Sequence, residues 1–568
     1  MKRIIAMSFF LLGGLTVFAQ NNCNIADELP IKLMSAEIKR GFKTFKKQTP
    51  PLYYLAYQYY TNEASTIIVS EGAVAYEKYG APLAEITVYP RVGTPALDNT
   101  RRLTGASRYD MALPAADMPA LDNGGKAFST RLWRATDSAV KKAQEELDSV
   151  LAAKLTAPKR FDDSPDFVYP PVERFCHTGE FAPFDYAKIK EMLLKASTLT
   201  KGKKFILSAD FSFSRENGYR YFVDSRGTRL KTPHQEVRLS YSVSGKTADG
   251  QEVTRFNSYD VLRPEELPDE ETLLTDVRRS IDELEQVLNA PEGEPLEAPT
   301  LLKGRAMAVF VHEVLGHRME GHRQKLEDFG RTFTDKIGQQ VVSPILTIVD
   351  DATLPYFEGK PMRGFYEYDE EGVKARPVTL VEKGVLKNFL MSSSPIKNFP
   401  ASNGHGRAEY DRRTVARMAV TRTIAEETVP YAQLEQKFLQ EIKRQNKPYG
   451  FLIEDLNGGF TMTDTSFPQS FKLEPTLMYR VYPDGRKEVV RGLDMVGTPQ
   501  VSFNKVLAAA DDYEVFNGSC GAESGWVPVS GIAPSVLLES MEMEKKAKST
   551  DKPPLLPPPY SLYKGAVK

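Results

Sequence analysis

The spacing of apolar residues predicts four helices in the first half of the chain. In residues 131–155, small and aliphatic side chains recur every three or four positions, as on the buried face of a helix. This set is Leu132, Ala135, Ala139, Ala143, Leu147 and Val150. Residues 30–46, 185–199 and 269–289 are also predicted to be helical, and the last of these segments is strongly charged.

Strand-like runs surround these helices and dominate the second half. In the first half they cover residues 65–79, 82–92, 204–214, 218–225 and 236–245. In the second half, residues 378–392 predict a hairpin, with two apolar runs around Lys383-Gly384. The turn sequence Pro483-Asp484-Gly485 lies between two further alternating runs. This order predicts an α+β protein with a mixed α/β N-terminal domain followed by a β-rich C-terminal domain.

The chain divides into two candidate domains with a distinct segment at each terminus. Residues 290–300 contain three prolines and no periodicity, which indicates a boundary between domains at 20–290 and 300–545. Residues 1–19 combine a positive start with an apolar run, which is typical of a signal peptide. The mature protein is therefore expected to be exported, either periplasmic or secreted. Residues 546–568 are rich in proline and predict an extended tail.

Composition argues against two classes of partner. The 568 residues include 74 Lys plus Arg and 75 Asp plus Glu, for a formal net charge of −1. The chain therefore lacks the basic footprint of a nucleic-acid-binding protein. No stretch after the signal peptide approaches the roughly eighteen apolar residues of a membrane-spanning helix. We expect neither nucleic acid binding nor a membrane span.

The segment 310–325, FVHEVLGHRMEGHRQK, holds three of the six histidines of the chain. A catalytic zinc site uses about three protein ligands and leaves a position for water, whose proton a nearby carboxylate accepts. Glu313 follows His312 just as a glutamate follows the first histidine of an H-E-x-x-H zinc helix. These residues indicate a metal site with Glu313 as general base, although histidines on a helix can also be exposed or part of a core.

The spacing of the two histidines is unusual for a zinc helix, because His317 follows His312 by five residues rather than four. In a regular helix, five residues turn the chain by roughly 500°, which would leave the two side chains about 140° apart. A shared metal therefore predicts a π-bulge or a break in the helix. Gly316 is the residue most tolerant of such a distortion.

The residues alone leave the third metal ligand open between His322 and Cys520. His322 lies ten residues after His312, the overall span of the H-E-x-x-H-x-x-G-x-x-H pattern. Cys520 has glycines nearby, so its backbone could approach a metal closely, and a thiolate is a good zinc donor. Alternatively, Cys520 is a buried free thiol or forms a disulfide with Cys176; the third cysteine is Cys23.

Residues from about 300 to 540 resemble the TldD/PmbA family of metallopeptidases, also called modulators of DNA gyrase. The resemblance rests on the segments HEVLGHRMEGHRQK, IVDDATLPYFEG, YDEEGVKARPVTLVEKGVLKNFLMS, NGHGRAEYDRRTVARM and GSCGAESGWVPVSGIAPSVLL. It implies a two-domain α+β fold, Zn2+ held by His312, His317 and Cys520, and Glu313 as the general base. It also implies cleavage of short or unfolded peptides by a homodimer or by a heterodimer with a related subunit.

This chain departs from the family in its export signal, its extra length and the presence of His322, which we expect at the surface. Gyrase-related partners are therefore not carried over. Glu320 is expected either to orient a ligand imidazole or to be exposed. His405, Arg412 and Arg413 are loop candidates for an oxyanion donor, although each is more simply structural or exposed.

Two other functions fit the sequence. A non-catalytic peptide-binding or assembly subunit would use a structural metal or disulfide, and a Cys176–Cys520 bond would favour that alternative. A hydrolase of other amides, such as a cell-wall peptide, would use the same site.

Overall fold

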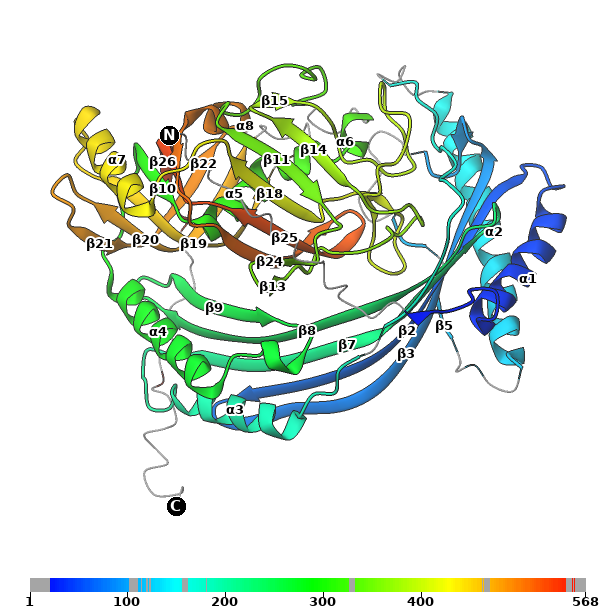
Figure 1. Ribbon diagram of the computed structural model, residues 1–568, viewed down its shortest axis with the longest axis horizontal. Coiled ribbons are helices and arrows are strands. Elements are labelled where there is room, and N and C mark those ends of the chain that lie inside the picture. Colours follow the sequence, from blue (N-terminus) through cyan, green and yellow to red (C-terminus); the bar gives the residue numbers. More distant parts are fainter. Residues whose placement is uncertain are drawn as a thin grey trace, which may run out of the picture.

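The computed structural model describes residues 21–101, 111–113, 115–118, 121, 124–155, 162–179, 181–325, 332–461, 463, 470–547, 554 and 556. The first half of the chain forms a long curved sheet, and the second half forms a two-sheet body that lies above it (Figure 1). The predicted signal peptide and nearly all of the predicted tail lie outside the described residues. Within the described part, no helix has both the length and the apolar character needed to cross a bilayer.

The sheet of the first half has nine strands in the order β1-β6-β8-β7-β2-β3-β4, with β5 beside β3 and β9 beside β8. Two long antiparallel pairs, β2 with β3 and β7 with β8, supply most of its surface. The strands are Asn21–Asn22 (β1), Leu52–Ser70 (β2), Ala73–Thr94 (β3), Leu97–Asp98 (β4), Ala115–Asp117 (β5), Arg174–Thr178 (β6), Ser208–Asp224 (β7), Arg229–Lys246 (β8) and Glu252–Asp260 (β9).

Two pairs of helices pack at opposite ends of this sheet (Figure 1). Helices α1 (Leu29–Phe45) and α2 (Lys126–Lys154) share a core with β2, β3 and β7. Helices α3 (Tyr186–Thr198) and α4 (Glu270–Asn289) share another core with β2, β7, β8 and β9. All four predicted helices are therefore present. The predicted apolar stripe of α2 is its buried face, which includes Leu132, Ala139 and Leu147.

The second half contains a seven-stranded and a six-stranded sheet. Their orders are β10-β19-β20-β22-β26-β23, with β21 beside β20, and β15-β14-β11-β18-β25-β24. The strands are Leu296–Leu302 (β10), Leu346–Asp351 (β11), Tyr356–Phe357 (β12), Lys360–Pro361 (β13), Pro377–Glu382 (β14), Val385–Leu386 (β15), Gly406–Arg407 (β16), Val415–Ala416 (β17), Val420–Ala425 (β18), Gly450–Thr461 (β19), Phe471–Val481 (β20), Lys487–Val490 (β21), Leu493–Gly497 (β22), Val506–Ala509 (β23), Glu514–Ala522 (β24), Gly525–Ala533 (β25) and Val536–Lys545 (β26).

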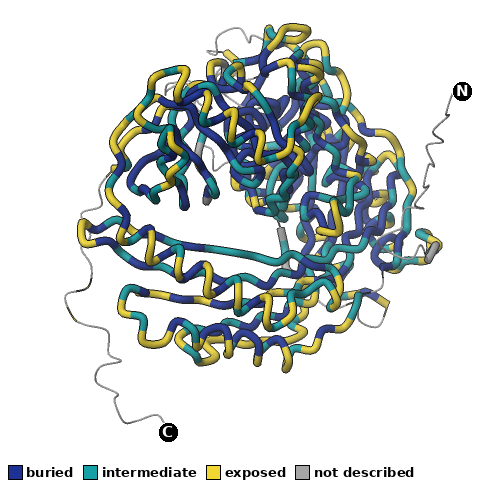
Figure 2. Tube along the Cα trace, turned by 60° about the vertical axis from the view of Figure 1, so that its left-hand side comes forward, coloured by how far each residue is buried: buried dark blue, intermediate teal, exposed yellow. Residues whose placement is uncertain are grey.

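The helices of this half are Gly304–Val314 (α5), His322–Lys325 (α6), Tyr431–Arg444 (α7) and Pro499–Ser502 (α8). Three 3₁₀ helices complete the described elements of the chain, at Pro264–Glu266 (η1), Gly316–Met319 (η2) and Phe503–Lys505 (η3). Helix α5 contacts β19 in one sheet and β24 and β25 in the other. It is therefore enclosed in the main core of this half, where buried residues concentrate (Figure 2).

The α+β class predicted from the sequence is confirmed. The predicted hairpin is formed by β14 and β15, and both Lys383 and Gly384 have positive φ at its turn. Two details differ. The proline-rich connector is shorter than predicted because Leu296–Leu302 form β10, which pairs with β19 and β26. Helix α7 was not predicted; it packs an apolar face against the seven-stranded sheet.

Candidate metal centre

The helix that carries the histidine motif ends between the two histidines. Helix α5 stops at Val314, and the 3₁₀ helix η2 begins at Gly316. The predicted interruption is therefore present, as a 3₁₀ turn rather than a π-bulge. It turns His317 back toward His312, and the centroids of the two imidazole rings lie 5.1 Å apart.

Close packing at this break leaves little room for a side chain at Gly316. Its φ is not among the positive values of the chain. A Cβ at this position would instead collide with Sδ of Met418. The glycine therefore allows the backbone of the break to lie against a buried methionine.

Strand β24, at the edge of the six-stranded sheet, brings Cys520 to the two histidines. The Cys520 Sγ lies 3.2 Å from Nε2 of His312 and 3.4 Å from Nε2 of His317. These three atoms all lie within 4.8 Å of one another, and the three residues are buried. A carboxylate oxygen of Glu313 lies 4.0 Å from Nε2 of His317. The structure therefore brings together all four residues implied by the resemblance.

The neighbours of Cys520 favour its thiolate. Burial alone would raise the pKa of this thiol, but His317, Arg417 and His312 hold the pKa well below its ordinary value. Burial also raises the pKa of Glu313, against the lowering effect of the two histidines. A thiolate and two imidazoles form a soft donor set, and Glu313 lies beside them as a proton acceptor.

Glu320 and Arg417 connect the histidine segment to the cysteine strand. Glu320 is fully buried, and its Oε1 lies 3.3 Å from Nδ1 of His317 and 3.3 Å from Nε of Arg417. Arg417 donates to the carbonyl oxygen of Cys520 over 2.7 Å. Burial would raise the pKa of Glu320, but Arg323, His317 and Arg417 hold it at about 2. This ionised carboxylate lies on the Nδ1 side of His317, and Nε2 of the same imidazole faces Cys520.

The expectation that His322 is a surface residue is wrong. His322 is only 6% exposed, and its Nε2 lies 2.6 Å from Oε1 of Glu523. Glu523 also accepts a hydrogen bond of 2.8 Å from Arg323. His322 is not part of the group formed by His312, His317 and Cys520. Its place on α6, beyond the turn at Glu320, directs it toward the Glu523 carboxylate.

The other loop candidates lie in structural contacts. His405 is fully buried, and its Nε2 lies 3.2 Å from Oδ1 of Asp350. The other carboxylate oxygen of Asp350 accepts a hydrogen bond from Thr421. Arg413 forms an ion pair of 2.5 Å with Glu146 on α2, and Arg412 lies 3.2 Å from Asp411. None of these contacts reaches the candidate metal ligands.

The donor set fits zinc. Zinc–nitrogen bonds of about 2.0–2.1 Å and zinc–sulfur bonds of about 2.3 Å place a sulfur and a nitrogen of a tetrahedral site about 3.5–3.6 Å apart. The measured 3.2 Å and 3.4 Å between Cys520 Sγ and the imidazole nitrogens come close to this spacing. His317 presents Nε2 because its Nδ1 faces Glu320.

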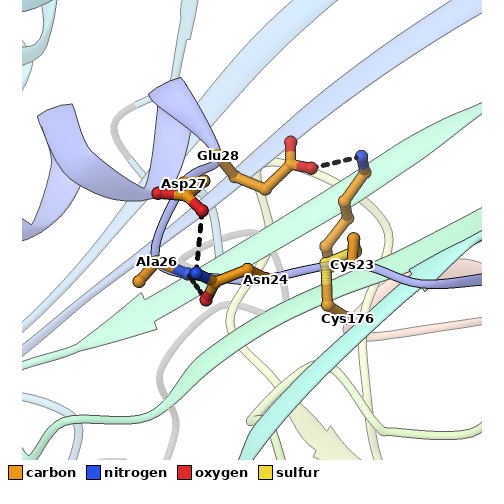
Figure 3. Close-up of a disulfide and its surroundings, with 7 residues drawn as sticks. Cys23, Asn24, Ala26, Asp27, Glu28 and Cys176 are labelled. Carbon is orange, nitrogen blue, oxygen red and sulfur yellow. Dashed lines mark hydrogen bonds and ion pairs between the residues drawn. A yellow bond between two sulfur atoms is a disulfide. The ribbon is translucent and has the colours of Figure 1, made fainter.

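The other two cysteines form a disulfide far from this centre along the chain. Cys23 is joined to Cys176, and Glu28 lies nearby (Figure 3). Glu28 also forms an ion pair of 2.9 Å with Lys231 on β8. The disulfide fastens the segment before α1 to strand β6, and Cys520 remains a free thiol.

The second half matches the family model for the PmbA/TldA metallopeptidase C-terminal domain over residues 295–545. These residues belong to the TldD/PmbA family. The chain is 25% identical to a metalloprotease of Methanocaldococcus jannaschii over 63% of this chain and 75% of that protein. It is 24% identical to a zinc metalloprotease TldD homolog of Saccharolobus solfataricus over 44% of this chain and 51% of that one.

Solved structures place the first half in the same fold as well. A Thermotoga maritima protein described as a modulator of a DNA gyrase matches 90% of this chain and 100% of its own, with a TM-score of 0.58 and 16% identity. TldE from Thermococcus kodakarensis matches 90% of this chain and 99% of its own, with a TM-score of 0.57 and 16% identity. At this identity the likeness supports the fold, and the TldD/PmbA domain carries the relationship to metallopeptidases.

Two residues of this centre were not singled out from the sequence. Arg417 and Glu523 lie inside the quoted segments NGHGRAEYDRRTVARM and GSCGAESG, but the sequence does not reveal their partners. Arg417 contacts Cys520, 103 positions away, and Glu523 contacts His322, 201 positions away.

Proposed function

We propose that this protein is an exported, zinc-dependent peptidase that hydrolyses short or unfolded peptides. His312, His317 and Cys520 hold Zn2+, and Glu313 is the general base. The observation that carries the proposal is the convergence of two imidazole nitrogens and a thiol within 4.8 Å, beside a glutamate. The metalloprotease names of its relatives support the same reaction class.

In this proposal, some residues hold the metal and another residue transfers a proton. Zinc, when bound, supplies a Lewis acid that lowers the pKa of water and polarises a peptide carbonyl. Glu313 accepts the proton of the attacking water and delivers it to the leaving amine nitrogen. Glu320 keeps the Nδ1 side of His317 occupied, so that the imidazole does not rotate. Arg417 fixes the backbone at Cys520, so that the thiolate keeps its place.

The alternative is a non-catalytic peptide-binding or assembly subunit. A disulfide between Cys176 and Cys520 would have favoured it, but Cys176 is paired with Cys23. A purely structural metal site would also have no use for Glu313. These two observations favour the peptidase.

Export and dimerisation are further parts of the proposal. The predicted signal peptide supports export, and so does the disulfide, because disulfides persist in oxidising compartments. Assembly as a dimer, either of two copies or with a related subunit, is proposed from the family resemblance, and TldE shares the fold. Peptides are the proposed substrates, with neither nucleic acid nor a membrane span involved.

The decisive experiment combines metal analysis with peptide hydrolysis in the parent, Cys520→Ala and Glu313→Ala proteins. We expect about one zinc per chain in the parent and in Glu313→Ala, and much less in Cys520→Ala. Hydrolysis of an unfolded peptide should fall by about 10²–10⁴-fold in Glu313→Ala. Full zinc content in Cys520→Ala would contradict the ligand assignment. Unchanged hydrolysis in Glu313→Ala would contradict the proposed base.

A further inference from the structure

Strands β24 and β25, both labelled in Figure 1, form a hairpin whose turn closely follows Cys520. Cys520 pairs with Val527, and the last pair before the turn is Ala522 with Gly525. In the described sheet, β24 is the edge strand and β25 is its strand neighbour. The sheet therefore supports β24 from the β25 side, and the position of the turn bears directly on the position of Cys520.

Glu523, in this turn, attaches the hairpin to helix α6. Its Oε1 lies 2.6 Å from Nε2 of His322, and its Oε2 accepts a hydrogen bond of 2.8 Å from Arg323. All three side chains are buried. Burial alone would raise the pKa of Glu523, but Arg323 and His322 hold this pKa well below its ordinary value. The turn is therefore held by an ionised carboxylate that contacts two side chains of α6.

Arg323 continues this series of contacts to one of the candidate ligands. Its Nε donates to Oε2 of Glu320 over 2.7 Å, and Oε1 of Glu320 lies 3.3 Å from Nδ1 of His317. The contacts therefore run without interruption from the imidazole of His317, through Glu320 and Arg323, to Glu523. Glu523 is three residues beyond Cys520 along the chain. The series thus begins at one candidate ligand and ends close to another.

A second buried arginine, Arg417, holds the residues on either side of Glu523. It donates to Oγ of Ser524 over 2.9 Å and to the carbonyl oxygen of Gly525 over 3.1 Å. It also donates to the carbonyl oxygen of Cys520 over 2.7 Å. The turn therefore has two buried anchors from different segments of the chain. Loss of the Glu523 anchor should loosen the turn without unfolding the hairpin, because Arg417 still holds it.

We propose that Glu523 is a positioning residue for the metal centre. It fastens the hairpin turn to α6, so that the sulfur of Cys520 lies beside the two imidazoles before a metal binds. Ligands that are already in place bind a metal more tightly, because less conformational freedom is lost on binding. His322 and Arg323 act through Glu523. This inference rests on the proposed zinc site and deepens it, because it names what brings the thiol to the histidines.

The zinc affinity of the full-length protein, measured by competition with a chelator, tests this role. We expect Glu523→Gln to weaken zinc binding by roughly tenfold or more. The matched control is Glu441→Gln on α7, since Glu441 is also a buried carboxylate and is paired with Arg444 over 2.6 Å. This control should lower the unfolding temperature and leave zinc affinity unchanged. An equal loss of zinc affinity in both variants would overturn the proposal, because general destabilisation would explain it.

A second variant tests whether the contact with Arg323 carries the effect. Arg323→Lys keeps the positive charge but lacks the planar fork that contacts both Glu320 and Glu523. It should weaken zinc binding several-fold. The double variant with Glu523→Gln should lose less affinity than the product of the two single losses, because both changes break the same contact. Losses that simply multiply would overturn the proposed route through Arg323.

Hydrogen exchange in the metal-free protein gives a measurement that needs neither zinc nor activity. Backbone amides of the β24–β25 hairpin should exchange several-fold faster in Glu523→Gln than in the parent or in Glu441→Gln, because the turn opens more often. Equal exchange in all three proteins would overturn the proposal.

The zinc content of the parent separates this inference from the proposed function. If the parent binds zinc and Glu523→Gln binds it equally well, the positioning role is overturned and the proposed metal ligands stand. If the parent itself binds no zinc, the proposed metal site fails, and the positioning role fails with it.

Discussion

Glu320 and Asp369 are fully buried carboxylates in the same half of the protein, yet their surroundings shift their pKa values in opposite directions. Burial raises the pKa of both groups. At Glu320, the charges of Arg323, His317 and Arg417 overcome this effect and hold the pKa at about 2. At Asp369, the neighbour is Glu371, and the pKa lies well above its ordinary value.

The difference shows how two buried acidic sites can be prepared for different tasks. Around Glu320 the positive partners belong to the protein, so the carboxylate is fixed before any ligand arrives. Around Asp369 and Glu371 two buried carboxyl groups lie close together, so their protonated forms are favoured. A charge-compensated carboxylate such as Glu320 suits positioning, because the protein itself fixes its charge and its place.

Of the variants considered, a replacement of Glu320 should lower the free energy of unfolding the most. Glu320→Gln leaves two buried guanidinium groups, Arg323 and Arg417, facing a neutral amide, which should destabilise the fold by about 3–5 kcal/mol. Zinc affinity should fall by roughly 10–100-fold, because His317 loses its partner. Urea unfolding and competition with a chelator measure the two effects, with Glu382→Gln as the exposed control. Unchanged zinc affinity would contradict the positioning role.

Removing the disulfide should cost stability without touching the metal centre. The double variant Cys23→Ser, Cys176→Ser should lose about 2–5 kcal/mol of unfolding free energy. Its zinc content should equal that of the parent, since Cys520 takes no part in the disulfide. Unfolding in urea and elemental analysis test both statements. A parallel loss of zinc would show that the centre depends on the first half.

Adding a side chain at Gly316, where the histidine helix is interrupted, should lower the free energy of unfolding by an intermediate amount. The new methyl group of Gly316→Ala collides with Met418, which should cost about 1–3 kcal/mol. Met418→Ala opens space at that position, so the double variant should be less destabilised than the sum of the single ones. A double-mutant cycle in urea measures this coupling. Strict additivity would mean that the contact is not the cause.

Neutralising Glu371 should have the smallest effect on the free energy of unfolding, and the sign of that effect should be opposite. The raised pKa of Glu371 means that the fold prefers the protonated form, so its charge lowers stability as pH rises above the unfolded pKa of about 4.3. Glu371→Gln should therefore raise the unfolding free energy at pH 7 by about 0.5–1 kcal/mol, a gain that disappears near pH 4.

For Glu320, with its lowered pKa, stability is instead lost as pH falls from about 4.3 toward 2. Unfolding curves across pH 3–7 would separate the two. A loss of stability in Glu371→Gln at pH 7 would contradict the contrast.

Local patterns were enough to predict most elements of the fold. The stripe of alanine and leucine on α2 and the turn at Lys383-Gly384 depend on near neighbours in the sequence, and both predictions hold. The five-residue spacing of His312 and His317 also predicted a break, because helix geometry is local. Helix α7 carries the same kind of apolar stripe, at Leu434, Phe438 and Ile442, so its signal was present in the sequence.

Contacts between distant segments could not be predicted in this way. Spacing alone left His322 and Cys520 equal as third ligands, and only the path of β24 brings the cysteine to the histidines. The burial of His322 and the bridge made by Arg417 depend on partners far along the chain. Such pairings are set by the packing of the two sheets around α5, for which a single sequence carries no direct signal.

The order of the three cysteines along the chain has a consequence for biogenesis. Cys23 emerges first during synthesis, Cys176 follows, and Cys520 comes last. In an exported protein, the first two thiols can meet and be oxidised while the third is still being delivered, since N-terminal segments generally fold first. Under the proposed function, Cys520 is the thiol that holds the metal, and it would be delivered after the other two cysteines of the chain. In such an exported protein, the order of the cysteines would then disfavour mispairing with Cys520.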